Sequence, residues 1–189
     1  TPEYTRAALA SGQLARRYKL PFRSSNAYAA NPVDAEAAYE SEMSLWGAVM
    51  GHANLILHSA GWMEGGLVAS FEKMVVDAEM IQGMTEFMRP LEVNDDTLAV
   101  DAIKEVGPGG HFFGSAHTLA RYETAFYAPL VSDWRNFETW RQAGAVEAPQ
   151  RANAIWKQLL ADYTPPPLDP AIDEALKAYV ARRKAEGGI

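Results

Sequence analysis

The chain contains 189 residues, the size of one ordinary domain, and 48% of them are hydrophobic, which suffices for a sizeable core. The absence of cysteine excludes disulfides, thiolate-bound zinc and a cysteine nucleophile. The net charge of −7 disfavours nucleic-acid binding, and no apolar run approaches the roughly 20 residues that span a bilayer. We therefore expect a soluble, cytoplasmic protein with no nucleic-acid or membrane partner.

The first ninety residues alternate between helical and extended patterns. Predicted helices and strands in this part are helix 3–18, strand 22–28, helix 34–52, strand 54–60 and helix 67–88. Pro2 stands at a first helical position, and Asp34 can cap the second helix. Helices of this length between strands indicate βα units on a parallel sheet with right-handed crossovers.

The pattern changes after Pro90, because no further strand is indicated. Predicted helices in this part are 95–106, 116–127, 132–143, 148–163 and 170–186. They are interrupted by a glycine-rich loop at 107–114 and by three prolines at 165–167. Two parallel strands cannot form a stable sheet alone. We therefore expect the chain to be the C-terminal piece of a larger α/β protein.

Four stretches, in order, carry a resemblance to a known family. They are DAEAAYE at 34–40, GWMEGGL with SFEK at 61–73, EVGPGGHFFGSAHTL at 105–119 and YTPPPLD at 163–169. Together they resemble the C-terminal part of the trimethylamine–corrinoid methyltransferase family. The resemblance implies the α/β fold of a (β/α)8 TIM barrel. Residues 1–90 would supply its last two βα units, and residues 91–189 a helical C-terminal extension packing on the barrel.

The same resemblance implies an amine:corrinoid methyltransferase. Such an enzyme moves a methyl group from an amine nitrogen to the cobalt of a corrinoid (cobalamin), which a separate partner protein carries. No covalently bound cofactor is implied. The remaining expected partners are a small quaternary or tertiary amine, the rest of the barrel and further copies of the chain in a homo-oligomer. The fragment alone is expected to be inactive.

The branch of the family follows from the loop at 26–33. The pyrrolysine of the trimethylamine enzymes would fall close to Asn31, where this sequence has neither pyrrolysine nor lysine. The chain therefore resembles the non-pyrrolysine branch, which acts on quaternary amines such as glycine betaine. A quaternary ammonium already carries its charge, so its reaction needs mainly positioning and desolvation. The alternatives are a pyrrolysine-type trimethylamine enzyme in another register, or a non-catalytic quaternary-amine binding subunit.

Candidate site residues follow the two predicted strands, because a (β/α)8 barrel has its active site at the C-terminal strand ends. Glu64, the catalytic candidate, could face a cationic amine, or it could cap the helix that begins near Leu67. Tyr28 and Trp62 could bind the substrate through cation–π attraction, or they could be core aromatics. His58 lies inside the second strand, and we interpret it as a core histidine rather than a substrate ligand.

Two further candidates lie in loops. Asn31, with Asn26 and Asp34 nearby, could bind a substrate carboxylate or could simply shape the turn. His111 could line the corrinoid entrance and contact substrate, or it could bond a backbone carbonyl within a structural loop. The spacing of His111 and His117 fits no common metal site, so no metal is predicted.

Overall fold

The computed structural model describes residues 1–187, which divide into two compact units after Trp156. The first unit contains, in chain order, α1 (Pro2–Tyr18), β1 (Arg23–Ser25), α2 (Ala35–Met50), β2 (Leu55–Leu57), β3 (Trp62–Met63), the 3-10 turn η1 (Glu64–Gly66), β4 (Val68–Ala69), α3 (Phe71–Phe87), α4 (Asp95–Leu98), α5 (Val100–Val106), the 3-10 turn η2 (Phe112–Gly114), α6 (Ala116–Leu119) and α7 (Phe137–Gln142). Helix α8 (Ala148–Asp162) ends in the second unit, which also holds α9 (Pro170–Ala185).

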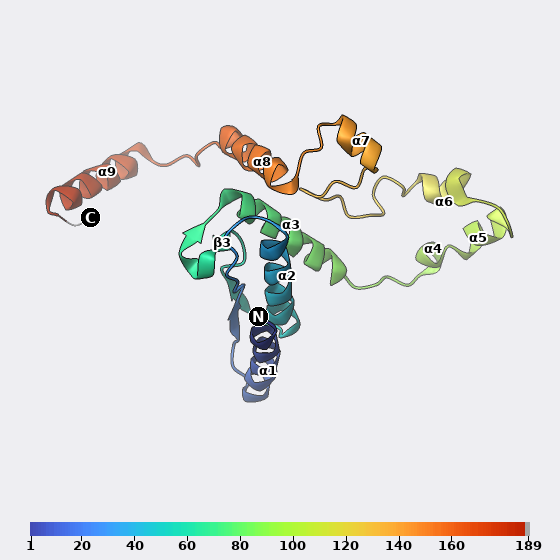
Figure 1. The fold of residues 1–189 in the computed structure, drawn as a ribbon, viewed down its shortest axis with the longest axis horizontal. Coiled ribbons are helices and arrows are strands. Elements are labelled where there is room, and N and C mark those ends of the chain that lie inside the picture. Colours follow the sequence, from blue (N-terminus) through green and yellow to red (C-terminus); the bar gives the residue numbers. More distant parts are fainter. Residues whose placement is uncertain (188–189) are drawn as a thin grey trace. The chain divides into compact units, whose positions relative to one another are not determined.

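Strands β1 and β2 pair in parallel, with α2 as the connection between them (Figure 1). The register runs from Arg23 opposite Leu55 to Ser25 opposite Leu57. Parallel strands need such a crossover, so the predicted βαβ arrangement and the mixed α/β class are confirmed. Each strand is three residues long, however, and so shorter than predicted. The (β/α)8 barrel itself stays a prediction.

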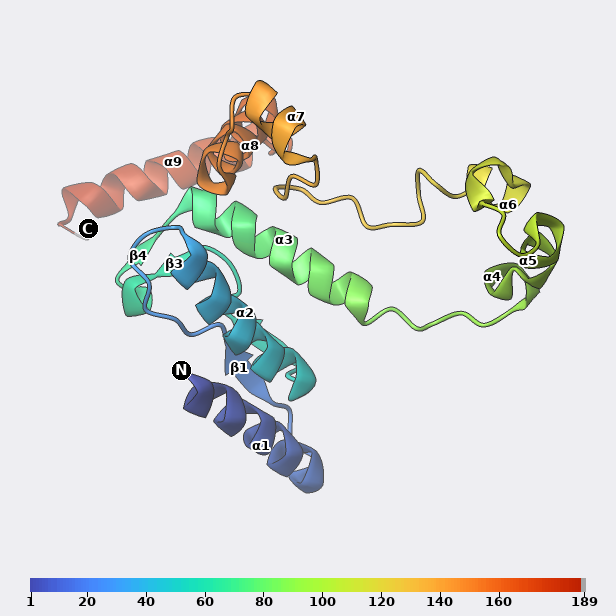
Figure 2. The same ribbon diagram turned by 45° about the vertical axis from the view of Figure 1, so that its right-hand side comes forward.

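Helix α1 packs closely against α2 (Figure 2) because glycines lie where the two helices meet. A Cβ on Gly12 would lie 2.0 Å from the carbonyl oxygen of Gly51, and one on Gly47 would lie 2.9 Å from the Thr5 side chain. The Arg16 guanidinium donates to the Gly51 carbonyl at 2.7 Å. These contacts fix α1 beside the helix that links the two parallel strands.

The predicted helix 67–88 is wrong at its start. Trp62–Met63 and Val68–Ala69 form a short antiparallel hairpin, and α3 begins only at Phe71. The Ser70 hydroxyl caps it by accepting from the Lys73 amide at 3.2 Å. The sequence interpretation missed this hairpin because each strand has only two residues, too few for an alternating pattern.

A small apolar core joins α3 to α8 within the first unit. Val75, Val131 and Ala152 are buried together, and Ile155 packs against them. The carboxylate of Glu79 also accepts hydrogen bonds from the backbone that leads out of Val131. This cluster holds the residues around 131 and the start of α8 against α3.

Three predictions between residues 91 and 143 need correction. The predicted helix 95–106 is broken at Ala99, whose left-handed φ of 51° separates α4 from α5. The predicted helix 116–127 ends at Leu119, and the predicted helix 132–143 begins only at Phe137. No residue of these helices is buried, so tertiary packing does not lengthen them, and helices this short are marginal alone.

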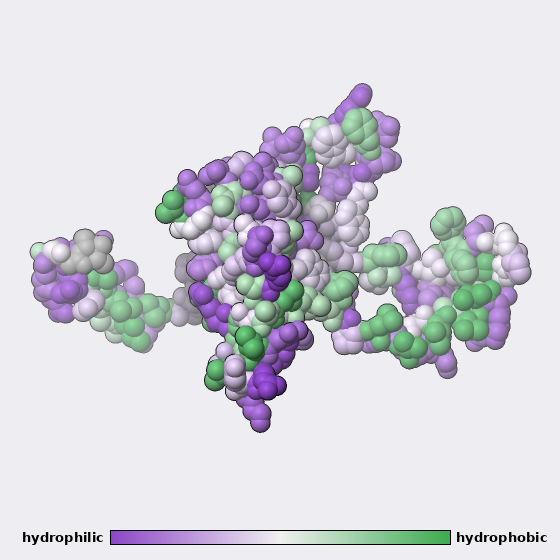
Figure 3. Space-filling model, turned by 60° about the horizontal axis from the view of Figure 1, so that its bottom comes forward, coloured by the Kyte–Doolittle hydropathy of each residue, from purple (hydrophilic) through white to green (hydrophobic). Residues whose placement is uncertain are grey.

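The segment from α4 to α6 presents apolar side chains at its surface. Figure 3 shows hydrophobic residues in broad patches over it. Its exposed large apolar side chains include Leu98, Val100, Ile103, Phe112, Phe113 and Leu119. Inside the segment, the His117 ring bonds the Asp96 carbonyl at 2.8 Å, and Arg121 pairs with the Asp96 carboxylate.

In the second unit, α9 begins at Pro170, as predicted, and Asp169 is its cap. The Asp169 carboxylate accepts from the Ala171 amide at 2.8 Å, and basic residues occupy the last turn. Within residues 1–187, no helix is both long enough and apolar enough to cross a membrane.

Candidate functional site

The loop that follows β1 is held in place by side chains of α2. The Ser44 hydroxyl accepts from the Ala27 amide at 2.8 Å. The Glu40 carboxylate accepts from the amides of Ala29 and Ala30 at 2.9 and 3.0 Å. These bonds satisfy three backbone donors of the loop that no sheet partner reaches. The loop is therefore rigid at the C-terminal end of its strand.

The turn after β3 is bonded directly to that loop. The Glu64 amide donates to the Ala30 carbonyl at 3.2 Å, and the Gly65 amide donates to the Tyr28 carbonyl at 3.3 Å. Two segments about 35 residues apart in sequence thus lie side by side. Each segment follows one of the two parallel strands, β1 and β2, whose C-terminal ends lie at the same edge of the sheet.

Three rings gather where these segments meet. The Trp62 ring contacts Tyr28 edge to face, with centroids 5.9 Å apart, and stacks on His58 at 4.8 Å. Tyr28 is only 6% exposed, Trp62 is half-buried and His58 is exposed. The prediction that His58 is a core histidine is therefore wrong, since its ring is at the surface. Trp62 and His58 present the accessible rings of the group.

Glu64 lies at the tip of the turn and is exposed. Its backbone is left-handed, with φ 52°, and it does not cap α3, because Ser70 does. The helix-cap interpretation of Glu64 is therefore wrong. Within residues 1–187 no hydrogen bond to its carboxylate occurs, so the charge is available to a ligand. Its predicted catalytic role stays a prediction.

The polar residues after β1 take different positions. Asp34 caps α2, accepting from the amides of Glu36 and Ala37, so it shapes the turn. Asn26 is fully buried and donates to the Ser59 carbonyl at 3.2 Å. Asn31 is exposed in the bend that follows the anchored loop. Its role in substrate binding stays a prediction.

A buried polar cluster beneath these loops was missed by the sequence interpretation. Lys73 and Asp77 of α3 form an ion pair with both side chains fully buried. The Lys73 ammonium also donates to the Ser41 hydroxyl at 2.7 Å and lies 4.3 Å from the Tyr28 ring centroid. Burial lowers the pKa of Lys73, against the opposing charge of Asp77. Burial, reinforced by Asp77, raises the pKa of Tyr28 well above its ordinary value.

His111 is not brought to this group. It lies in the loop 107–114, exposed, with its ring 5.4 Å from that of Phe113. The described residues provide no hydrogen bond to its side chain, so the alternative, a bond to a backbone carbonyl, is not formed. Its proposed contact with a corrinoid stays a prediction.

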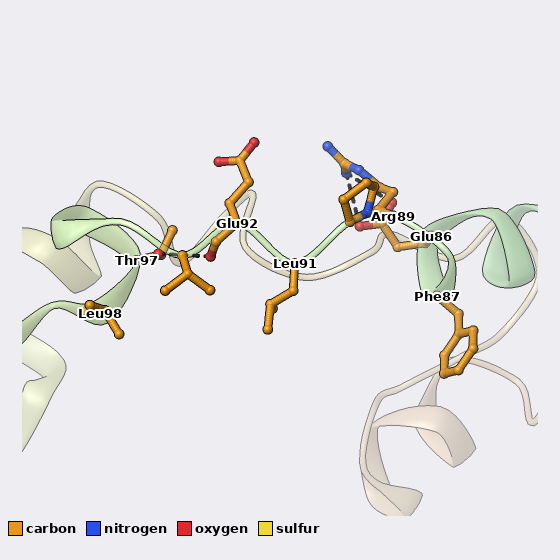
Figure 4. A pocket seen from close by; sticks show the side chains of 9 residues that line it. Glu86, Phe87, Arg89, Leu91, Glu92, Thr97 and Leu98 are labelled. Carbon is orange, nitrogen blue, oxygen red and sulfur yellow. Dashed lines mark hydrogen bonds and ion pairs between the residues drawn. The ribbon is translucent and has the colours of Figure 1, made fainter.

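A hollow of the first unit lies elsewhere and lacks comparable chemistry. It measures about 870 Å³ and is formed by the end of α3 and the linker to α4. Figure 4 shows Phe87 and Leu91 on one side of the linker and Glu92 on the other. The charged groups at its rim include Glu86 and Arg89, which pair with each other at 3.0 Å.

Comparison with known proteins identifies the family. A model of the trimethylamine methyltransferase (MTTB) family matches residues 1–188. The chain is 40% identical over its whole length to the glycine betaine methyltransferase of Desulfitobacterium hafniense strain Y51, of which it covers 39%. It is 33% identical to the trimethylamine methyltransferase MttB of Desulfitobacterium hafniense strain DCB-2, covering 38% of it, and 30% identical to MttB2 of Methanosarcina mazei, covering 36%. The chain thus spans less than two fifths of the length of these relatives, and it belongs to the trimethylamine methyltransferase family.

Proposed function

We propose that the chain is part of a methyltransferase that demethylates a quaternary amine such as glycine betaine, with a corrinoid on a separate protein as methyl acceptor. The observation that carries the proposal is an accessible aromatic ring, Trp62, two residues from an exposed carboxylate, Glu64, in the turn after β2 that bonds to the loop after β1. The 40% identity to a glycine betaine methyltransferase supports the substrate class.

Trp62 and Glu64 suit a quaternary ammonium for different reasons. An aromatic face attracts a cation by about 0.5–2 kcal/mol, and a methylated nitrogen has no N–H for which it would need a hydrogen-bond acceptor. The Glu64 carboxylate adds charge attraction and orients the nitrogen. Because the amine loses its positive charge as the methyl group leaves, this attraction is strongest in the bound substrate. Both side chains therefore act mainly through binding and orientation.

The corrinoid is proposed as methyl acceptor because the resemblance to the family implies it. A reduced corrinoid, when bound, supplies the cobalt that accepts the methyl group, while the bonding pair of the broken C–N bond stays on nitrogen. The loop 107–114 fits contact with a corrinoid's amide side chains, because His111 is exposed there. A Cβ at Gly107, Gly109 or Gly114 would meet no atom within 4 Å, so the loop is open at these positions.

The barrel is also a proposal. β1 and β2 alone leave both edges open, and Leu55 on β2 is 55% exposed. The relatives have more than twice the length of this chain. We propose that the other barrel strands come from further residues of a longer polypeptide, which would cover β1 and β2.

Methyl transfer from glycine betaine is the direct test. The full-length protein is mixed with its corrinoid protein in the reduced state, and formation of dimethylglycine is followed. We expect turnover, and a rise in KM of about tenfold in Trp62→Leu with a smaller change in kcat. Trp46→Leu, at a half-buried tryptophan of α2 that contacts Phe87, serves as the control and should keep the KM. Turnover of trimethylamine alone would contradict the substrate class.

A further inference from the structure

One carboxylate oxygen of Asp77 joins the two segments that form the candidate site. Oδ2 accepts from the Tyr28 hydroxyl at 3.2 Å and from the Gly61 amide at 2.9 Å. Tyr28 follows β1, whereas Gly61 directly precedes Trp62 after β2. The Asp77 side chain is fully buried, so water does not compete for either hydrogen bond.

Lys73 binds the other carboxylate oxygen of Asp77. Its ammonium pairs with Oδ1 of Asp77, donates to Ser41 on α2 and faces the Tyr28 ring. Three donors thus meet three partners, and the buried carboxylate is neutralised. A buried ion pair is weak evidence for stability, because apolar residues of the same volume often serve as well or better. Apolar residues at positions 73 and 77 could not, however, accept the two hydrogen bonds that Oδ2 of Asp77 accepts.

We propose that Asp77 is a positioning residue of the amine site, acting through Tyr28 and Gly61 to fix the ring of Trp62. This rests on the proposed function, since Trp62 is the ring assigned there to the substrate cation. The backbone of Trp62 is held by the bond to its neighbour Gly61. Its ring is held by edge-to-face contact with Tyr28. Both restraints end on the same oxygen atom.

The opposite charges of Lys73 and Asp77 determine which groups the substrate cation meets at the amine site. Lys73 cancels the charge of Asp77 and covers one face of Tyr28 with a resident cation. The substrate cation therefore meets Glu64 as its carboxylate. It meets Trp62, rather than Tyr28, as its principal ring. Tyr28 links Asp77 to Trp62, because its hydroxyl bonds Asp77 and its ring contacts Trp62.

Two double variants separate hydrogen bonding from charge. Lys73→Met with Asp77→Asn removes both charges but leaves an amide oxygen that can accept from Tyr28 and Gly61. Lys73→Met with Asp77→Val removes both charges and the acceptor. Neither variant leaves an unpaired buried charge, so both should fold. Tyr28→Phe removes one of the two donors and keeps the ring.

Three readouts are taken on the full-length protein. They are the indole N–H resonance of Trp62, identified by its loss in Trp62→Phe, the exchange rate of the Gly61 amide and the Kd for glycine betaine. In the valine variant we expect a shifted Trp62 resonance, faster Gly61 exchange and a Kd raised about 10- to 100-fold. The asparagine variant should stay close to the parent in all three, and Tyr28→Phe should shift the Trp62 resonance while Gly61 stays protected.

The outcomes distinguish this inference from the proposed function. If the valine variant keeps the Trp62 resonance and the Gly61 protection of the parent, Asp77 does not position the loops and the inference is wrong. It is equally wrong if both double variants lose the same amount, because charge and not the acceptor would then matter. If the parent binds no amine, the proposed function has failed. The resonance and exchange readouts still decide whether Asp77 fixes Trp62.

Discussion

Trp62 keeps its place partly because Gly66 has no side chain. A Cβ at Gly66 would lie 2.4 Å from the Trp62 ring, and the backbone there has a left-handed φ of 95°. Gly65 is also left-handed, with φ 62°, but a Cβ on it would meet nothing within 4 Å. A substitution at either glycine would therefore strain the left-handed backbone, but only a side chain at position 66 would also collide with the Trp62 ring.

This difference yields a prediction about Gly66→Ala. Each alanine should cost roughly 1–2 kcal/mol of folding free energy through its left-handed backbone, so both variants lose stability. Gly66→Ala alone should displace the indole and weaken glycine betaine binding. Thermal unfolding and ligand titration of the two variants measure these effects. Equal ligand affinity in Gly65→Ala and Gly66→Ala would show that the indole does not contribute to binding.

Of the residues in and beneath the candidate site, some were predictable from the sequence and others were not. Trp62 and Glu64 follow an apolar run, which is enough to place them at a strand end. Lys73 and Asp77 have the i,i+4 spacing of an ordinary surface ion pair, and nothing local shows that they are buried. Their burial depends on Ser41 and Tyr28, which are more than thirty residues away in sequence. Such a cluster follows from tertiary packing and not from a motif.

Among the elements, the contact between α1 and α2 depends on Gly12. Because the nearest atom to an added Cβ is the Gly51 backbone carbonyl, no side chain can move to make room. We predict that Gly12→Ala destabilises the protein by about 1–3 kcal/mol through overpacking. Gly83→Ala is the control, since Gly83 lies in α3 with no atom within 4 Å of its Cβ position. That variant should gain about 0.5–1 kcal/mol, and chemical denaturation measures both. A neutral Gly12→Ala would contradict the close packing.

The junction of α3 and α8 depends on Glu72. Its carboxylate accepts from the Asn153 amide at 2.6 Å and from the Trp156 indole at 2.8 Å. These bonds lower the pKa of Glu72 from 4.5 to about 2, and the bond from Asn153 has the largest effect. A carboxyl group whose pKa is lower in the folded state stabilises the fold above its unfolded pKa. That stabilisation is lost as the pH falls from about 4.5 towards 2.

Glu72→Gln tests this pH dependence. We expect a loss of about 1.5–3 kcal/mol at neutral pH, the range for hydrogen bonds to a charged group. Between about pH 4.5 and 2 the difference from the parent should shrink, because the parent loses its charge there. Unfolding free energies across this pH range provide the measurement. A difference that is constant with pH would mean that the charge of Glu72 plays no part.

A capping residue made some helix starts predictable, but the start of α3, which Ser70 caps, was predicted too early in the chain. Asp34 caps α2 as expected, and Asn94 and Asp169 cap α4 and α9. The predictions were wrong in the exposed segment after Pro90, where a helical pattern occurs without packing to sustain it. Periodicity marks a face that can be buried, but it does not show that this chain buries it.

For the molecule as a whole, the open sheet is the main consequence of the fold. Two three-residue parallel strands are marginal by themselves. We predict that backbone amides of β1 and β2 exchange rapidly in the 189-residue chain alone and slowly in the full-length protein, where further strands would cover both edges. Hydrogen exchange of Ser24 and Ile56 in the two proteins provides the comparison. Equal protection in both would argue against the barrel.

The most direct test of the amine site is calorimetric titration of the full-length protein with glycine betaine, repeated with Glu64→Gln. Glu174→Gln, on exposed α9, is the matched control for loss of one carboxylate charge. We predict saturable binding to the parent and to Glu174→Gln, and a Kd raised about tenfold in Glu64→Gln, which corresponds to about 1.4 kcal/mol. Unchanged binding in Glu64→Gln, or no binding to the parent, would contradict the assignment of these strand ends as the amine site.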